Sequence, residues 1–237
     1  MTRRRWIADE VSGNRAFLLG PHAEHLARVL RACVGQEFEM ATPEGVRWGR
    51  IITIAHDRVE FQLGEKIETS ESLRLTAVIS IIKFDRMEWA IEKCTELGLS
   101  RIVPVIARRT DKHFATAATK RVERWRRIGR EASEQSRRSS PPEICQPMKL
   151  TDVLSIPASM RIVLDESEHG ILLKEALQGA ADSGDLLLAF GPEGGWTADE
   201  SRLFRESGWI AASLGRTILR AETAAIAAVS IAVSELQ

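Results

Sequence analysis

The first seventy residues alternate apolar and polar side chains, as half-buried antiparallel strands do. This alternation, with two shorter apolar runs, predicts strands at residues 17–19, 38–40, 46–54 and 58–63. A short helix is predicted over 22–30, with Leu26, Val29 and Leu30 on its buried face. These elements indicate a small β-rich module at the start of the chain.

From residue 73 onward, buried strands alternate with helical patterns. Apolar runs of strand length predict strands at residues 75–82, 102–106, 161–165, 186–190 and 210–214. Apolar side chains at helical spacing predict helices that begin near residues 85, 119, 172, 197 and 222. Gly98 and Gly208 are expected to end two of these helices. Strands that alternate with helices indicate an α/β fold with a mostly parallel sheet.

Local signals refine three of these elements. Asp85 with Glu88, and Thr197 with Glu200, have the spacing of a capping box. In a capping box two side chains satisfy free backbone N–H groups at the start of a helix. Pro104 lies inside a strand run and has no N–H to donate, so it favours an edge strand or a bulge.

Two helices differ from the others in composition. The helix predicted over 119–138 is basic, and its expected inner face consists of Val122, Trp125, Gly129 and Ala132. The last helix, over 222–236, has only Glu222 and Glu235 as charged residues, so it is expected to be buried on most sides. It is interpreted either as a core helix or as a core helix that also packs against a second subunit.

Charge is unevenly distributed along a chain that is neutral overall. The 237 residues include 33 basic and 33 acidic side chains. Residues 101–138 hold 12 Lys and Arg against 4 Asp and Glu, whereas residues 150–237 hold 6 against 13. A basic middle segment can attract a polyanion without a basic isoelectric point. A solvated basic helix would produce the same pattern.

No pattern in the chain indicates a metal site, a membrane span or secretion. The three cysteines are far apart, without the spacing of a zinc site, and Cys94 falls on an apolar helix face. No apolar run approaches transmembrane length, and the first residues lack the apolar core of a signal peptide. We therefore expect a cytoplasmic protein with no metal and no membrane partner.

Candidate chemistry gathers in two glycine-containing segments, 191–197 and 214–224, each of which follows an apolar strand. Such strand-to-helix turns meet at one edge of a parallel sheet, where α/β proteins bind ligands. Glu193 would repel a pyrophosphate, and no Walker A or nucleophile-elbow motif is present. A neutral or cationic ligand, such as adenosine joined to a sulfonium amino acid, suits Glu193 better.

Several blocks, in order along nearly the whole chain, resemble one family. They lie at residues 3–6, 25–31 with 34–35, 92–98, 131–138, 191–195 and 214–224. The chain resembles the RsmE family of 16S rRNA uridine-N3 methyltransferases, in the SPOUT superfamily. The resemblance implies a PUA-like RNA-binding β-barrel over 1–70 and a knotted, dimerising SPOUT methyltransferase domain over 73–237. It also implies S-adenosylmethionine as cofactor and, as partners, the 16S rRNA of the small ribosomal subunit and a second copy in a homodimer.

The resemblance and the chemistry of the reaction point to two catalytic candidates. Arg220 could stabilise negative charge on a uridine ring, or it could instead hold the knot together through Glu222 or Glu193. Glu193 could orient the donor or accept the N3 proton, or it could only brace its turn. Two alternative functions remain open: a SPOUT enzyme acting on another RNA or on a ribose 2′-OH, and a non-enzymatic RNA-binding assembly factor.

The remaining expected site residues fall into two sets. The cofactor is expected at three loops that contain Leu164, Gly191, Pro192, Glu193, Gly194, Gly195, Leu214, Gly215, Ile218 and Leu219. The apolar residues Leu214, Ile218 and Leu219 suit the faces of adenine, although they could equally be ordinary core. RNA contacts are expected from basic side chains, which could alternatively be solvated surface charges: Arg3, Arg4, Arg5, Arg28, Arg31, Arg137 and Arg138.

Overall fold

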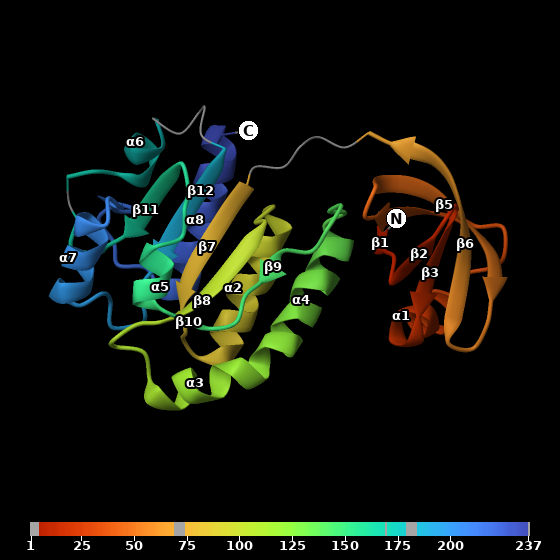
Figure 1. Ribbon diagram of the computed structural model, residues 1–237, viewed down its shortest axis with the longest axis horizontal. Helices are drawn as coiled ribbons and strands as arrows, with labels where there is room; N and C mark the ends of the chain where they lie inside the picture. The colour runs from red at the N-terminus through yellow and green to blue at the C-terminus, as the bar shows by residue number, and fades with distance from the viewer. Residues whose placement is uncertain (1–4, 69–73, 169, 179–183, 237) are drawn as a thin grey trace. The chain divides into compact units, whose positions relative to one another are not determined.

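The computed structural model describes residues 5–68, 74–168, 170–178 and 184–236, which form two compact units (Figure 1). The N-terminal unit consists of residues 1–71 together with 133–141. The C-terminal unit consists of residues 72–132 and 142–237. The N-terminal unit is therefore assembled from two separate stretches of the chain.

The N-terminal unit contains a mixed sheet with the strand order β1-β4-β5-β6-β3-β2. Its strands are β1 (Trp6–Ile7), β2 (Glu10–Ser12), β3 (Arg15–Leu19), β4 (Glu37–Thr42), β5 (Gly45–Ile54) and β6 (Arg58–Ile67). All neighbouring pairs are antiparallel except β1 with β4. Alternate side chains, including Met40, Ile51 and Phe61, form its apolar core. The four strands predicted from alternation are confirmed.

The helical segment of this unit differs from the prediction. It consists of α1 (Gly20–Glu24) and a π-helical turn over His25–Val29, closed by a bond from Leu30 N–H to the His25 carbonyl. Leu26 is buried as predicted, but Val29 and Leu30 are 64% and 49% exposed. The prediction for these two residues is wrong because the wider turn shifts them off the face that carries Leu26.

The C-terminal unit contains a sheet with the strand order β10-β8-β7-β12-β11-β13, and β9 also pairs with β8. The strands are β7 (Arg74–Ser80), β8 (Arg101–Ile106), β9 (Glu143–Ile144), β10 (Met148–Lys149), β11 (Met160–Leu164), β12 (Asp185–Phe190) and β13 (Ile210–Ala212). Every pairing is parallel, which confirms the predicted sheet type.

Helices cover both faces of this parallel sheet. They are α2 (Phe84–Glu96), α3 (Lys112–Ala117), α4 (Val122–Gln135), α5 (Leu150–Leu154), α6 (Leu173–Leu177), α7 (Ala198–Glu206) and α8 (Ala221–Leu236), with a 3-10 turn over Ala118–Arg121. Side chains from α2, α4, α6 and α8 share one core cluster with one face of the sheet. Side chains from α5 and α7 share a second cluster with the opposite face.

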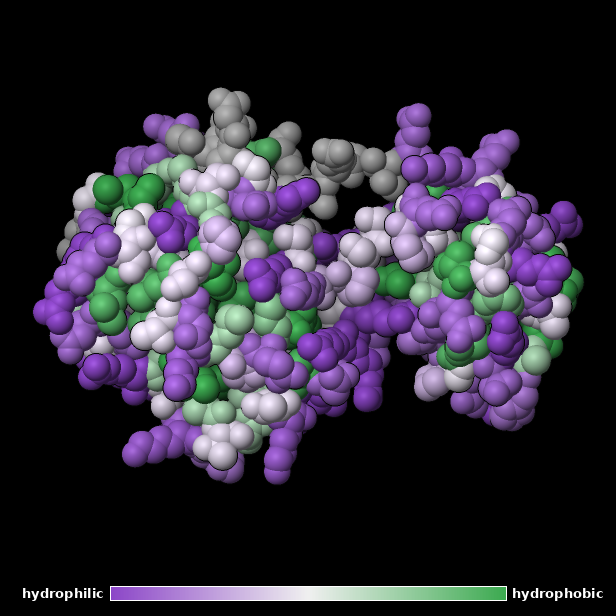
Figure 2. All heavy atoms as spheres, in the orientation of Figure 1, coloured by the Kyte–Doolittle hydropathy of each residue, from purple (hydrophilic) through white to green (hydrophobic). Residues whose placement is uncertain are grey.

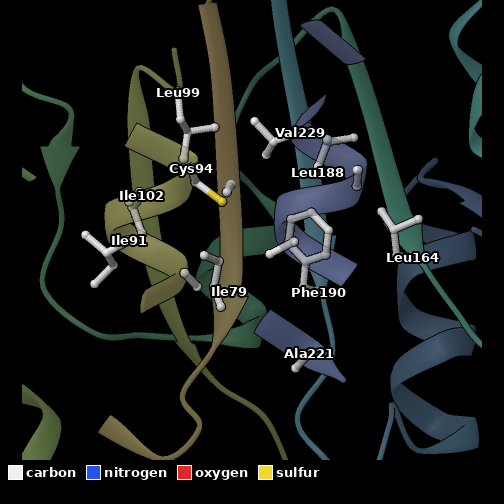
Figure 3. Close-up of a cluster of buried hydrophobic side chains, with 14 of the residues drawn as sticks. Ile79, Ile91, Cys94, Leu99, Ile102, Leu164, Leu188, Phe190, Ala221 and Val229 are labelled. Carbon is white, nitrogen blue, oxygen red and sulfur yellow. The ribbon is translucent and has the colours of Figure 1, made fainter. Parts of the chain in front are cut away.

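The larger cluster lies between the sheet and the α2 and α8 helices (Figure 3). Ile79 and Phe190 reach it from β7 and β12, Cys94 from α2 and Val229 from α8. Burial raises the pKa of the Cys94 thiol to about 12, so it stays protonated at neutral pH. Cys94 is therefore a core residue, as the helix pattern predicted.

One of the two predicted capping boxes is present. The Thr197 side chain accepts a hydrogen bond from Glu200 N–H, and Glu200 accepts one from Thr197 N–H at 2.9 Å. The prediction at Asp85 is wrong, because α2 begins one residue earlier and has no side-chain cap. Glu88 instead binds Arg124 of α4, at 2.6 and 2.8 Å.

Pro104 lies in β8, which pairs on both sides and is not an edge strand. On the outer side, β9 pairs with residues 101–102 and β10 with residues 105–106. The outer ladder is therefore interrupted beside Pro104, where no N–H is available to continue it. The missing donor divides the neighbouring strand into two short pieces.

The inner face of α4 is as predicted: Val122, Trp125, Gly129 and Ala132 are buried. Its outward side chains are mostly charged, and hydrophilic atoms cover this helix in Figure 2. The helix ends at Gln135 rather than at Arg138, because Arg137 has a left-handed backbone with φ of 61°. The last helix, α8, packs against α2, α6 and the central strands β7 and β12, and Ala225, Ala228 and Ala232 are fully buried.

Candidate functional site

A cavity of about 680 Å³ lies at the carboxyl ends of β11, β12 and β13 in the C-terminal unit. Its walls come from Asp165 and Glu166 after β11, the turn 191–196 after β12 and the loop 213–220 after β13. This is the edge at which parallel α/β sheets bind ligands. Leu164, Phe190 and Ala221, at one end of the cluster in Figure 3, belong to both the core and the cavity wall.

The turn 191–196 depends on its glycines. Gly195 has φ of 69°, and a Cβ atom there would lie 2.4 Å from Glu166 Oε1. A Cβ on Gly191 would lie 3.3 Å from the Trp196 indole nitrogen. That nitrogen donates a hydrogen bond of 3.1 Å to the Leu164 carbonyl and so ties the turn to β11. The backbone here can come close to a bound molecule because no side chains intervene.

The structure brings most of the expected cofactor residues together. Of the ten, only Gly194 is not part of the cavity wall, and its carbonyl accepts a hydrogen bond from Arg109. Ile218 is 82% exposed, so it is not ordinary core, whereas Leu214 packs partly against the main cluster. The catalytic candidates Arg220 and Glu193 also line the cavity.

Arg86, on the first turn of α2, is a site residue that the sequence did not indicate. Its Nη1 donates to Glu193 Oε1, and its Nε lies 3.8 Å from Glu222 Oε1. Within the described part of the chain Arg220 forms no ion pair with either glutamate. Arg86, rather than Arg220, therefore connects Glu193 and Glu222. No local sequence signal could have revealed it, because Arg86 and Glu193 are separated by 107 positions.

Glu222 lies in the first turn of α8 and is only 3% exposed. Its Oε2 atom has no hydrogen-bond partner among the described residues. A buried carboxylate is costly unless a cation or hydrogen bonds compensate it. The helix N-terminus favours a negative charge here, and Arg86 supplies the ion pair.

Asp165 is a second buried carboxylate beside the cavity, at 7% exposure. Its Oδ1 accepts from Ser167 N–H at 2.9 Å and from the Ser167 hydroxyl at 2.7 Å. Its Oδ2 accepts from the Ser201 hydroxyl at 2.7 Å. Burial alone would raise the pKa of the Asp165 carboxyl group, but these bonds and the nearby Arg205 hold it below its ordinary value.

Asp165→Asn is expected to lower the free energy of unfolding by about 1–3 kcal/mol at pH 7, because an amide cannot accept all three bonds. Because the pKa of Asp165 is lower in the folded protein, its ionised carboxylate stabilises the fold at any pH above its unfolded pKa of about 3.9. This stabilisation is lost as the pH falls through the pKa of the folded state. Urea unfolding at pH 7, 4 and 3 measures this difference, because the contribution of Asp165 changes only below the unfolded value of about 3.9. Exposed Asp152→Asn is the control. An unchanged stability at pH 7 would contradict the role of Asp165.

The expected RNA-binding arginines are placed in different ways. Arg3 and Arg4 lie outside the described residues. Arg5 is buried and binds Glu39 through Nε at 2.9 Å, and Arg137 binds the same carboxylate. Arg28 and Arg31 are exposed, and Arg138 is half-buried. Because Arg5 is buried and bound to Glu39, little of its guanidinium remains accessible to an RNA phosphate.

Among the described residues, no helix is both long enough and apolar enough to cross a membrane. In the same part of the chain, no group of three or more His, Cys, Asp or Glu side chains is placed to hold a metal ion.

Comparisons with known proteins identify the family of this chain. Residues 69–233 match a family described as an RNA methyltransferase domain. A ribosomal RNA small subunit methyltransferase E from Aquifex aeolicus is 30% identical over 229 residues, which cover 95% of this chain and 97% of that protein. A protein of the same name from Synechocystis is 32% identical over 84% of this chain, and the match spans 66% of that protein, just under two thirds.

A solved structure from the same family has a similar fold. The crystal structure of a ribosomal RNA small subunit methyltransferase E from Neisseria gonorrhoeae bound to S-adenosyl methionine has a TM-score of 0.84 and 28% identity. The superposition covers 96% of this chain and 95% of that one. The chain therefore belongs to the RNA methyltransferase domain family and, within it, to the ribosomal RNA small subunit methyltransferase E family.

Proposed function

We propose that this chain transfers a methyl group from S-adenosylmethionine to N3 of a uridine in the 16S rRNA of the small ribosomal subunit. The observation that carries the proposal is the cavity, in which the turn 191–196 and the loop 213–220 bring Glu193 and Arg220 together. Its volume of about 680 Å³ falls within the range of roughly 300–1,000 Å³ for small-molecule sites. Family membership and the donor-bound Neisseria relative support the same reading.

The residues of the cavity fit this donor. Leu214, Leu219 and Ile218 offer apolar surface to the adenine, and the turn 191–195 offers backbone groups with little side-chain cover. Glu193 places a carboxylate on the wall, which suits the positively charged sulfur of the donor. When bound, the donor supplies an electrophilic methyl group on a positively charged sulfur.

The chain's contribution to the reaction is alignment and charge stabilisation. Uridine N3 carries a proton and lies on the Watson–Crick edge, so the base must be unpaired or extruded from its helix. The cavity would align the base with the donor methyl group, so that the bond to N3 could form as the bond to sulfur breaks. As N3 gives up its proton to solvent water, charge would grow on the ring oxygens, where the exposed Arg220 guanidinium would stabilise it.

The finer architecture is part of the proposal. The C-terminal unit is a SPOUT domain whose end is threaded into a trefoil knot, and the N-terminal unit is a PUA-like RNA-binding barrel. The knot is supported by the path of α8, which leaves β13 at the sheet edge and returns across β12 and β7 to α2. The exposed Arg28 and Arg31 support RNA contact by the N-terminal unit.

The protein works as a homodimer in this proposal. Support comes from α8, which is apolar on almost every side, and from Trp89 on the neighbouring α2, which is 50% exposed. Sedimentation velocity at micromolar concentration is expected to give the mass of a dimer. A monomer under these conditions would contradict an active site built from two subunits.

Nucleoside analysis tests the reaction directly. Deletion of the gene is expected to remove 3-methyluridine from digested 16S rRNA, and expression of the wild-type chain is expected to restore it. Transfer of a labelled methyl group to small subunits from the deletion strain identifies the substrate in vitro. Retained 3-methyluridine would contradict the proposal, and loss of a 2′-O-methylated nucleoside would indicate a ribose target. Calorimetry without heat on addition of the donor would favour a non-enzymatic binding protein.

A further inference from the structure

Arg86 joins two carboxylates that belong to distant parts of the chain. Its Nη1 donates to Glu193 in the turn after β12, and its Nε lies 3.8 Å from Glu222 Oε1 at the start of α8. The side chain of Arg86 is 26% exposed and lines the cavity, whereas that of Glu222 is 3% exposed. The three charges therefore run from the protein interior to the cavity wall.

Glu222 fixes the interior end of this row. Arg86 is the one cation within ion-pair distance of Glu222 in the described part of the chain. A buried carboxylate holds its partner strongly, because separation would leave an uncompensated charge in the interior. The ion pair with Glu222 therefore keeps the Arg86 guanidinium in place even when the exposed Glu193 side chain moves.

Arg86 in turn fixes the exposed end. Glu193 is followed by Gly194 and Gly195, in a turn whose backbone is held by Arg109 at the Gly194 carbonyl, while the Glu193 side chain extends from the turn. Its side chain is 44% exposed, so without a partner it would sample many rotamers. The bond from Arg86 holds Oε1 in one place and leaves Oε2 available on the cavity wall.

We propose that Arg86 is a positioning residue for the methyl donor: anchored by Glu222, it holds the Glu193 carboxylate towards the positively charged donor in the cavity. This inference rests on the proposed function. The donor, rather than the RNA, is the partner of Glu193, because a carboxylate attracts a cation and repels a polyanion. Since Oε1 already accepts a bond from Arg86, Glu193 faces the donor through Oε2.

Donor affinity measured by calorimetry tests this inference, because it does not depend on turnover. Arg86→Gln is expected to raise the Kd for S-adenosylmethionine at least tenfold, as charge-assisted bonds contribute more than neutral ones. Arg86→Lys, which keeps the charge, is expected to restore part of the loss. Glu193→Gln is expected to weaken binding similarly, and the double variant Arg86→Gln with Glu193→Gln to bind within about twofold of the weaker single variant.

Two further measurements separate positioning from folding. If Arg86 served only the fold, Arg86→Gln would reduce the fraction of active protein and lower kcat without raising the donor Kd or KM. Adding Glu222→Gln to Arg86→Gln removes the unpaired buried charge, so this double variant is expected to regain thermal stability while its donor Kd stays high. The matched control is Arg202→Gln, because Arg202 also lies between two carboxylates, Asp199 and Glu206, on the exposed face of α7.

The outcomes are distinct. A donor Kd for Arg86→Gln within threefold of wild type, or additive effects of Arg86→Gln and Glu193→Gln, would overturn the role of Arg86. Wild-type protein that binds the donor but methylates no RNA would instead contradict the proposed function and leave the test of Arg86 intact.

Discussion

Arg220→Ala is expected to lower kcat for methyl transfer by about 10²–10³-fold, the loss found when one preorganised donor to a developing charge is removed. Arg220 lines the cavity, is exposed, and makes no ion pair within the described part of the chain. Its guanidinium is therefore available to the uridine oxygen that gains charge in the transition state. Arg86 cannot take over this role, because it is held by Glu193 and Glu222.

Single-turnover methylation of small subunits with a labelled donor measures this effect. In the proposed mechanism Arg220 contacts the uridine and not the donor, so the donor Kd is expected to stay within about twofold of wild type. Thermal unfolding and sedimentation are expected to be unchanged. Arg202→Ala, a substitution at an exposed position of α7, serves as the control. Wild-type turnover by Arg220→Ala would remove this residue from the mechanism.

Phe204→Ala is expected to lower the free energy of unfolding by about 3–5 kcal/mol, the usual cost of deleting a buried aromatic ring. Phe204 is fully buried on α7, and its ring centroid lies 4.8 Å from that of Trp196 and 5.1 Å from that of Trp209. Trp196 also lines the cavity and bonds the Leu164 carbonyl. Loss of the central ring therefore loosens the turn that carries Glu193, and donor affinity is expected to fall as well.

Urea unfolding followed by tryptophan fluorescence measures the stability loss. Leu203→Ala is the matched control, because Leu203 is the neighbouring residue on the same helix and is 37% exposed. Its effect is expected to stay well below that of Phe204→Ala, since substitutions at exposed positions cost little. Equal losses in the two variants would show that the stack of three rings adds no stability.

The sequence was most informative where structure is set by neighbouring residues. Alternation and apolar runs located four strands of the N-terminal unit and five of the C-terminal unit, and the helical spacing of apolar residues placed Cys94 on the buried face of α2. Predictions failed where backbone geometry departed from the regular period. Val29 and Leu30 became exposed through a π-helical turn, and Pro104 interrupted an outer ladder without making β8 an edge strand.

The features of the site likewise divide into those set by local sequence and those set by packing between distant segments. The two glycine-containing segments are local, so the sequence could place them after buried strands and at one edge of the sheet. Arg86 and the burial of Glu222 depend on α2 and α8 packing together, and no short segment carries that information. The chemistry of the pocket could thus be proposed from its loops, whereas the arrangement of its charges required three dimensions.

The discontinuous make-up of the N-terminal unit has a consequence for truncated forms of the chain. This unit needs residues 133–141 as well as 1–71, and the later stretch supplies Arg137, which shares the Glu39 carboxylate with Arg5. A coding fragment that stops at residue 71 would leave out that second cation. Glu39 is only 7% exposed, so a fragment of this kind is expected to be less stable than the unit that contains both arginines.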